Sequence, residues 1–282
     1  MQLGLHGKTL RLIDAAKKIL QSHNPMTLRQ VFYRLVSRQV LENTRNGYQT
    51  LSKALVTARQ GGLIPWEHIE DRLRRPRQAS MWSSLSDFAE SAVQSFRLDV
   101  WASQPRCIEV WLEKDALSGI FENALDPYGV TLNVGRGYDG WTSIQQAAER
   151  YLSCDTECRI TVLYFGDFDP SGLDIARSLQ DRLAFFDCHP EIVKVALTKE
   201  DVVRFNLPPD FTKATDPRRA AFVEKYGDMA VELDALPPDI LEKRLVKEVA
   251  ARMNLQALAE VHEHEKQERQ LLISMLDRTR KS

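Results

Sequence analysis

Two aspartates separated by a single residue are the most informative feature of this 282-residue chain. Asp167 and Asp169 follow the mainly apolar residues 160–165 after a single glycine, and a helical pattern starts soon after them. Like charges this close raise each other's pKa unless a cation lies between them. Mg²⁺ binds oxygen ligands of this kind. The pair therefore predicts a divalent-metal site at the carboxyl end of a strand, where ligands collect in open α/β sheets.

A third carboxylate, Glu113, ends another predicted strand, residues 108–112. If the two runs are neighbouring parallel strands, Glu113 faces Asp167 and Asp169 across a gap the size of one ion. Mg²⁺ held there would offset charge on a phosphate and orient the attacking and leaving oxygens of phosphoryl transfer. Each motif also has a plainer interpretation, Glu113 as a surface residue and residues 167–172 as a turn with a helix N-cap. Taken together, the motifs favour the metal site.

A tyrosine on a predicted helix is the candidate nucleophile. Residues 27–38 have the spacing of one buried helix face, and Tyr33 projects off that face with Arg29 one turn earlier. Tyrosine can act as a covalent nucleophile, but its phenol ionises at about pH 10, so a nearby cation or base must help. Arg29 could stabilise the phenolate or the attacked phosphate. The plainer interpretation is a partly exposed packing tyrosine.

These motifs resemble those of a known family over about residues 8 to 240. Residues 113–116 look like the Glu-Lys-x-Ala motif of the topoisomerase VI A subunit and its meiotic double-strand-break relatives, which carry a TOPRIM domain. Residues 167–172 match that family's Asp-x-Asp-Pro-x-Gly motif. Residues 29–33 resemble its Arg-x-x-Tyr-Tyr motif, with Phe32 in place of the first tyrosine. Among its members, the chain resembles the small stand-alone type called Mini-A.

The resemblance implies a mechanism. Glu113, Asp167 and Asp169 would ligate Mg²⁺, and Tyr33, helped by Arg29, would attack a DNA phosphate. The product would be a 5′-phosphotyrosyl double-strand break that can be resealed, as in a type IIB topoisomerase. A homodimer would suit the two antiparallel strands of double-stranded DNA. Because the sequence has no Gly-x-x-x-x-Gly-Lys-Ser/Thr loop, a step driven by ATP would need a partner ATPase subunit.

Charge is unevenly distributed along the chain. Residues 1–90 hold 14 Lys and Arg against 7 Asp and Glu, whereas the remainder holds 24 against 32. A basic front part favours polyanion binding. Lys114 and Arg136 are further candidates for DNA contact, and the glycine-rich loop around Arg136 partly resembles a Gly-Lys-Gly-Tyr-Pro-Asp stretch of the same family. A proline-broken segment, either phosphate-binding or a solvated loop, supplies four more candidates: Arg72, Arg74, Arg75 and Arg77.

The elements that must position these residues follow two patterns. Three helical stretches and then a short extended piece predict a winged helix-turn-helix, in which a helix enters the DNA major groove. Alternating strands and helices after it predict a parallel sheet covered by helices. The expected fold class is therefore α/β. Its expected parts are a winged-helix domain at 1–78, a helical linker at 79–104, a TOPRIM-like domain at 105–240 and a charged helical tail at 241–282.

The individual elements can be placed by their spacing. The expected N-terminal helices are 8–21, 27–38 and 47–59, with the extended piece at 63–70. The expected strands are 108–112, 130–134, 160–165 and 192–197, and the helices between them are 115–124, 142–152 and 171–186.

Some features narrow the function without deciding it. No apolar run is long enough to span a bilayer and no secretion signal is evident, so a cytoplasmic protein without a membrane partner is expected. The four cysteines have the spacing of neither a zinc framework nor a disulfide scaffold. A third acidic pair, Glu232 and Asp234, could join the metal site or lie on a dimer surface. Tyr48 is interpreted as a packing or phosphate-contacting residue.

Three other functions stay open at this point. The first is a hydrolytic TOPRIM nuclease of plasmid or phage defence, in which water attacks and Tyr33 is structural. The second is a non-catalytic DNA-binding module whose acidic cluster is a relic. The third is a primase-like nucleotidyl transferase, although the sequence contains no separate nucleotide site.

Overall fold

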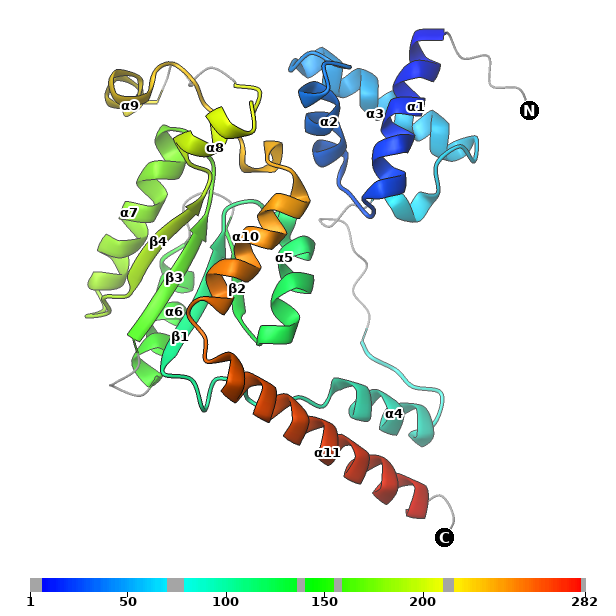
Figure 1. Ribbon diagram of the computed structural model, residues 1–282, viewed down its shortest axis with the longest axis vertical. Helices are drawn as coiled ribbons and strands as arrows, with labels where there is room; N and C mark the ends of the chain where they lie inside the picture. The colour runs from blue at the N-terminus through cyan, green and yellow to red at the C-terminus, as the bar shows by residue number, and fades with distance from the viewer. Residues whose placement is uncertain (1–6, 70–78, 136–139, 155–158, 210–215, 280–282) are drawn as a thin grey trace.

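The structure is a computed structural model that describes residues 7–69, 79–135, 140–154, 159–209 and 216–279. It is a mixed α/β fold built around a parallel sheet (Figure 1). The strands are β1 (Arg106–Leu112), β2 (Thr131–Val134), β3 (Arg159–Phe165) and β4 (Glu191–Ala196). Within the described ranges the helices are α1 (Gly7–Ser22), α2 (Leu28–Ser37), α3 (Arg45–Gln60), α4 (Leu85–Ser95), α5 (Ser118–Leu125), α6 (Trp141–Ser153), α7 (Pro170–Ala184), α8 (Lys199–Arg204), α9 (Arg219–Tyr226), α10 (Pro238–Ala250) and α11 (Leu255–Thr279).

The sheet has the order β2-β1-β3-β4, with every pairing parallel. Side chains on successive residues of a strand point to opposite faces, and the two faces have separate cores. Val110 and Phe165 pack with α5 and α10 on one face, whereas Trp111 and Tyr164 pack with α6 and α7 on the other. Because both faces are covered, the inner residues of β1 and β3 are mainly apolar, as in most parallel sheets. All four expected strands and the helices between them are confirmed, with ends that shift by a few residues.

The strand order changes direction between β1 and β3, since β2 lies on one side of β1 and β3 lies on the other. Leu112 at the end of β1 is in register with Phe165 at the end of β3. The backbone N–H of Glu113 donates to the Phe165 carbonyl at 2.9 Å. Glu113 and the loop after Phe165 therefore meet at the topological switch point, where open α/β sheets bind ligands.

The N-terminal part consists of α1, α2 and α3, which bury one apolar face each. Thr27 caps α2 with a full capping box: its side chain accepts from the Gln30 N–H, and the Gln30 side chain accepts from the Thr27 N–H at 2.7 Å. The piece at 63–70, expected to be extended, is mostly a turn: the described residues form a short 3₁₀ turn, η1 (Trp66–His68), and Ile69 makes one isolated parallel bridge with Met26. Residues 70–78 lie outside the described part of the chain.

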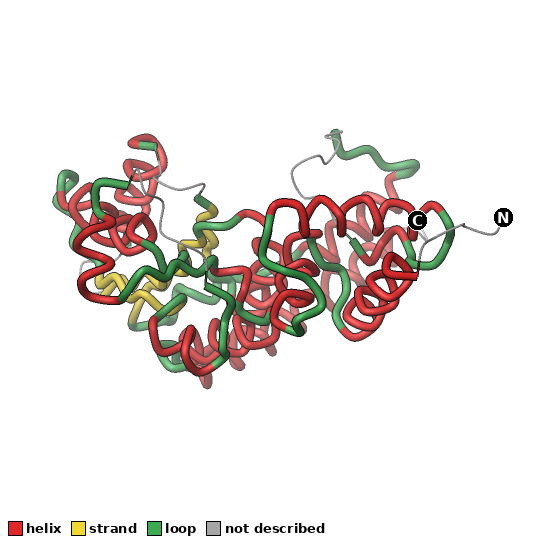
Figure 2. Tube along the Cα trace, turned by 90° about the horizontal axis from the view of Figure 1, so that it is seen from above, coloured by secondary structure: helices red, strands yellow, loops and turns green. Residues whose placement is uncertain are grey.

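The C-terminal part is helical, as expected, but it is divided into α10 and α11. The helix α10 returns to the sheet and packs beside α5, whereas α11 extends away from it beside α4 (Figure 1). Seen from above, the strands gather toward one end of the molecule, and the two termini lie toward the other end (Figure 2). None of the helices in the described part of the chain is long and apolar enough to cross a membrane.

Candidate active site

Tyr33 is buried, and the expectation that it lies on an open polar face of its helix is wrong. Only 8% of Tyr33 is exposed, and its neighbour on the same face, Gln30, is 2% exposed. The reason is tertiary: the 3₁₀ turn η4 (Leu233–Ala235), which leads into α10, packs against α2 and covers this face (Figure 1). The Tyr33 ring also packs edge-on against Phe32, with the ring centroids 5.4 Å apart.

The covering segment brings a carboxylate to the tyrosine. The Tyr33 hydroxyl donates to Glu232 Oε2 at 2.7 Å. Lys114 Nζ lies 2.9 Å from the same oxygen, and Arg29 Nη2 lies 3.4 Å from it. A phenol and two cations thus converge on one carboxylate, which is 34% exposed. We call Tyr33, Arg29, Lys114, Glu232 and Asp234 the tyrosine cluster.

Lys114 joins the tyrosine cluster to the end of the sheet. Its Nζ lies 3.2 Å from Asp234 Oδ1 and 3.3 Å from Asp167 Oδ1, in addition to its contact with Glu232. The Lys114 side chain is 11% exposed, so in this structure its ammonium group is occupied by internal carboxylates. The expected DNA contact of Lys114 would require some of these partners to be replaced.

A short backbone pairing explains why these distant segments meet. Phe168, the residue between the two aspartates, forms an antiparallel bridge with Val231, with mutual N–H to carbonyl distances of 2.9 and 3.0 Å. Phe168 is 2% exposed and packs on the rings of Phe222 and Tyr226. The bridge fixes the residues after Val231 beside the aspartate loop, and the Leu233 N–H donates to Asp167 Oδ1 at 2.7 Å.

The charges of the tyrosine cluster are strongly perturbed. Burial, and then the negative charge of Glu232, raise the pKa of Tyr33 far above its usual value, so the phenol is neutral at rest. Burial alone would raise the pKa of Glu232, but Lys114, Tyr33 and Arg29 outweigh it and hold that pKa below its usual value. Burial raises the pKa of Asp234 to about 6. Burial opposes the charge of Lys114, but the surrounding carboxylates prevail and raise its pKa.

Glu113, Asp167 and Asp169, which we call the acidic edge, follow the adjacent carboxyl ends of β1 and β3. The Asp167 N–H donates to Glu113 Oε2 at 2.9 Å, and the Tyr164 hydroxyl donates to the same oxygen at 3.1 Å. Burial raises the pKa of Glu113, and the Asp167 charge adds to this effect. Burial also raises the pKa of Asp167 in spite of Lys114.

Asp169 caps the helix that follows. Its side chain accepts from the Gly172 N–H at 2.6 Å and from the Ser171 hydroxyl at 2.9 Å, which is the N-cap alternative raised by the sequence. The turn is tight, because a Cβ at Gly172 would lie 2.3 Å from the Asp167 carbonyl oxygen. The glycine of the Asp-x-Asp-Pro-x-Gly motif is therefore needed for the backbone to fold back on Asp167.

Lys194, on β4, is a site residue that sequence reasoning missed. Its Nζ donates to the carbonyl oxygens of Asp167 at 2.8 Å and Gly172 at 3.4 Å. Burial lowers the pKa of Lys194 to about 8, against the attraction of the nearby carboxylates. The only available signal was one lysine inside an otherwise apolar strand, which does not by itself identify a partner.

The donor chemistry of Glu113, Asp167 and Asp169 fits Mg²⁺. All three supply carboxylate oxygens, which hard divalent cations prefer, and the raised pKa of Glu113 reflects burial and like-charge repulsion that a cation would relieve. As the side chains are placed, no group of three or more His, Cys, Asp or Glu residues within the described ranges is gathered closely enough to hold an ion. Lys114 and Lys194 offset part of the negative charge instead.

The other predicted site residues are placed as follows. Glu232 and Asp234, for which the sequence left open a place in the metal site or on a dimer surface, belong to the tyrosine cluster. Tyr48 packs its ring edge-on against Phe32, with the ring centroids 5.3 Å apart. The arginines expected to contact DNA lie outside the described residues: Arg72, Arg74, Arg75, Arg77 and Arg136.

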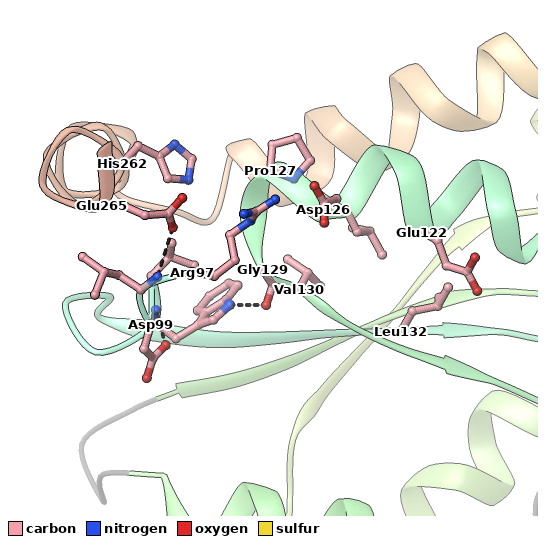
Figure 3. A pocket seen from close by; sticks show the side chains of 14 residues that line it. Arg97, Asp99, Glu122, Asp126, Pro127, Gly129, Val130, Leu132, His262 and Glu265 are labelled. Atoms are coloured by element: carbon pink, nitrogen blue, oxygen red, sulfur yellow. Dashed lines mark hydrogen bonds between the residues drawn. The ribbon is translucent and has the colours of Figure 1, made fainter. Parts of the chain in front are cut away.

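A pocket of about 480 Å³ lies elsewhere, lined by α11, by the segment before β1 and by the end of α5 with its connection to β2 (Figure 3). Two hydrogen bonds join the segments that line this pocket. The Leu98 N–H donates to Glu265 Oε2 at 3.0 Å, and the Trp101 indole N–H donates to the Gly129 carbonyl at 2.6 Å. It shares no residue with the tyrosine cluster or the acidic edge, so it contributes nothing to that chemistry.

Comparison of the chain with protein-family models and with curated proteins finds no match. The basis for a functional proposal is therefore the chemistry of the site itself.

Proposed function

We propose that the chain is a DNA-cleaving transesterase of the type IIB topoisomerase kind, in which Tyr33 attacks a DNA phosphate. The observation that carries the proposal is a continuous chain of polar contacts. The Tyr33 hydroxyl bonds to Glu232, Glu232 contacts Lys114, and Lys114 contacts Asp167 at the acidic edge. A helix of the N-terminal part and the switch point of the sheet thus contribute to one site.

The residues have distinct roles in the proposed reaction. Tyr33 is the nucleophile, and Arg29 and Lys114 bind the phosphate that it attacks, since two cations near one hydroxyl suit a phosphodiester anion. Glu113, Asp167 and Asp169 would hold the metal. When bound, Mg²⁺ would offset negative charge on the phosphate. Tyr164 and the backbone N–H of Asp167 orient Glu113 through hydrogen bonds at 3.1 and 2.9 Å.

The proposal includes a particular architecture and particular partners. We propose that α1 to α3 with residues 63–78 form a winged-helix domain that binds double-stranded DNA, and that residues 105–240 form a TOPRIM-like domain. The basic balance of the first 90 residues supports the first assignment. The parallel sheet with carboxylates at its switch point supports the second. A homodimer would place one tyrosine on each strand, and a separate ATPase subunit would supply any strand passage.

A plasmid assay tests the proposal. Supercoiled plasmid is incubated with the protein and Mg²⁺, the reaction is stopped with detergent, and half of each sample is treated with protease. We expect linear or nicked DNA that enters the gel only after protease treatment, and none with Tyr33→Phe. Tyr48→Phe is the matched control, because Tyr48 packs against the same Phe32 ring and should cleave like the wild type.

A hydrolytic nuclease is the second candidate, and one observation favours it. Tyr33 is buried and neutral at rest, with a pKa raised by burial and by Glu232, as a structural tyrosine would be. In that case water attacks the phosphate, and free DNA ends appear without protease. Equal cleavage by the wild type and Tyr33→Phe would select this candidate and reject the transesterase.

A further inference from the structure

A tyrosine nucleophile must lose its proton, and Glu232 is placed to accept it. The distance from the Tyr33 hydroxyl to Glu232 Oε2 is 2.7 Å, within the range required of a general base. Asp234 is less suitable, because its side chain is 0% exposed and a proton on it would have no path to solvent. The Glu232 side chain is 34% exposed, so it can exchange a proton with water.

In the resting structure Glu232 is a weak base. Lys114 and Arg29 lie 2.9 and 3.4 Å from the oxygen that accepts from Tyr33. Two cations at such distances stabilise the carboxylate and oppose its protonation. The same pair of cations is what a DNA phosphate requires, because Lys and Arg bind phosphate through charge-assisted hydrogen bonds. A phosphate entering the cluster would therefore compete with Glu232 for its two partners.

We propose that Glu232 is the proton acceptor of the cleavage step, and that a DNA phosphate releases it for this role by taking over Lys114 and Arg29. This inference rests on the proposed function of Tyr33. The arrangement couples activation to substrate, because the tyrosine stays protonated until a phosphate is in place. It also supplies the base that the weak acidity of tyrosine demands.

The proposed step balances as follows. The Tyr33 hydroxyl gives its proton to the Glu232 carboxylate, and its oxygen forms a bond to phosphorus. The bond between phosphorus and the 3′ oxygen breaks, and this oxygen keeps the electron pair. The proton then passes from Glu232 to the 3′ oxygen, directly or through water, to give a 3′ hydroxyl. Resealing is the same sequence in reverse, so Glu232 serves both directions.

The test compares wild-type protein, Glu232→Gln, Glu232→Asp and Tyr33→Phe, with Glu242→Gln, an exposed carboxylate on α10, as the matched control. Single-turnover formation of the protein–DNA adduct on a labelled duplex is measured with Mg²⁺ over a range of pH. Duplex affinity is measured by fluorescence anisotropy, and folding by thermal melting. Glu232→Gln keeps the size of the side chain and a carbonyl that accepts from Tyr33, but it cannot take a proton at neutral pH.

We expect Glu232→Gln to slow adduct formation about 10²- to 10⁴-fold, with unchanged or tighter duplex affinity because one negative charge is removed. Because Asp234, Glu113 and Asp167 also take up protons at acidic pH, the rate should fall there in every variant, and the rate at neutral pH is the deciding comparison: Glu232→Asp should keep much of the wild-type rate, whereas Glu232→Gln should not. If Glu232→Gln fails to fold, Glu232→Ala measured with and without added acetate decides, because a rate that a small carboxylate does not restore rejects the base.

Three results would overturn the proposal. If Glu232→Gln forms the adduct at the wild-type rate or faster, Glu232 is not the base, and the assignment of Tyr33 as the nucleophile still stands. If a higher Mg²⁺ concentration restores adduct formation by Glu232→Gln, Glu232 is a metal ligand and not the base. Absence of any Tyr33-dependent adduct in the wild type removes the proposed function, and this proposal with it.

Discussion

Replacing Asp234 with asparagine should stabilise the protein at neutral pH, although it deletes a contact to Lys114. The Asp234 side chain is 0% exposed, and its Oδ1 lies 3.2 Å from Lys114 Nζ. Its Oδ2 has no hydrogen-bond partner among the described residues and lies 3.7 Å from Arg29 Nε. Burial outweighs these attractions and raises the pKa of Asp234 to about 6. The nearby cations therefore do not fully offset the desolvation cost of the ionised Asp234 carboxylate.

The sign and size of the effect follow from proton linkage. In the unfolded chain an aspartate has a pKa of about 3.9, about two units lower, and each unit corresponds to about 1.4 kcal/mol. Above the unfolded pKa the unfolded state loses the proton first, so stability falls as pH rises, until the folded group also ionises at about pH 6. At neutral pH the charge of Asp234 should therefore cost about 3 kcal/mol.

Urea unfolding of the wild type and Asp234→Asn at about pH 4 and about pH 7.5 measures this difference. We expect the variant to be more stable by about 2–3 kcal/mol at the higher pH and nearly equal at the lower pH. Lys114 keeps Glu232 and Asp167 as partners, so the substitution does not isolate a buried cation. A variant that is less stable than the wild type at the higher pH would show that ion pairing outweighs desolvation, and would refute the reasoning.

Three further predictions concern the scaffold. Asp201→Asn should lower the free energy of unfolding in urea by about 3–5 kcal/mol, because it leaves Arg244 without its buried carboxylate. Burial opposes the charge of Asp201, but Arg244 holds the pKa of Asp201 below its usual value. The stability that the pair confers is therefore present above about pH 4 and is lost as the pH falls through the folded pKa. Thr27→Ala should cost about 1 kcal/mol in the same assay, since it removes the capping box of α2, and an unchanged midpoint would contradict this. Gly172→Ala should lower the free energy of unfolding by about 1–3 kcal/mol and reduce the adduct yield, because its Cβ would displace the Asp167 carbonyl. Wild-type values for both would show that the turn tolerates a side chain.

The scaffold could be predicted because its signals are local. Strand residues such as Val110 and Phe165 lie in apolar runs bounded by turns, and Thr27 stands where a helix cap is expected. The order of strands and helices then leaves few topologies, and in each of them Glu113 and Asp167 lie at strand ends. Their contact through the Asp167 N–H agrees with that prediction.

The surroundings of Tyr33 could not be predicted in the same way. Helical spacing says which residues share a face, and it set Tyr33 apart from Leu35, but it does not say what covers the other face, and Tyr33 is buried there as well. That cover is η4, which is placed by the Phe168–Val231 bridge and not by any property of α2. Likewise, a short acidic pair such as Glu232 and Asp234 has no periodicity that reveals a partner.

The separation of Tyr33 and Glu232 by 199 positions in the chain has a consequence for synthesis on the ribosome. At about 5–20 residues per second, roughly 10–40 s pass between the appearance of the tyrosine and that of its carboxylate partner. During this interval α1 to α3 can fold, because their contacts are local, but the tyrosine cluster cannot form. Every nascent chain therefore passes through a stage in which the basic helices exist without the acceptor of Tyr33, and the site is completed only after η4 has been made.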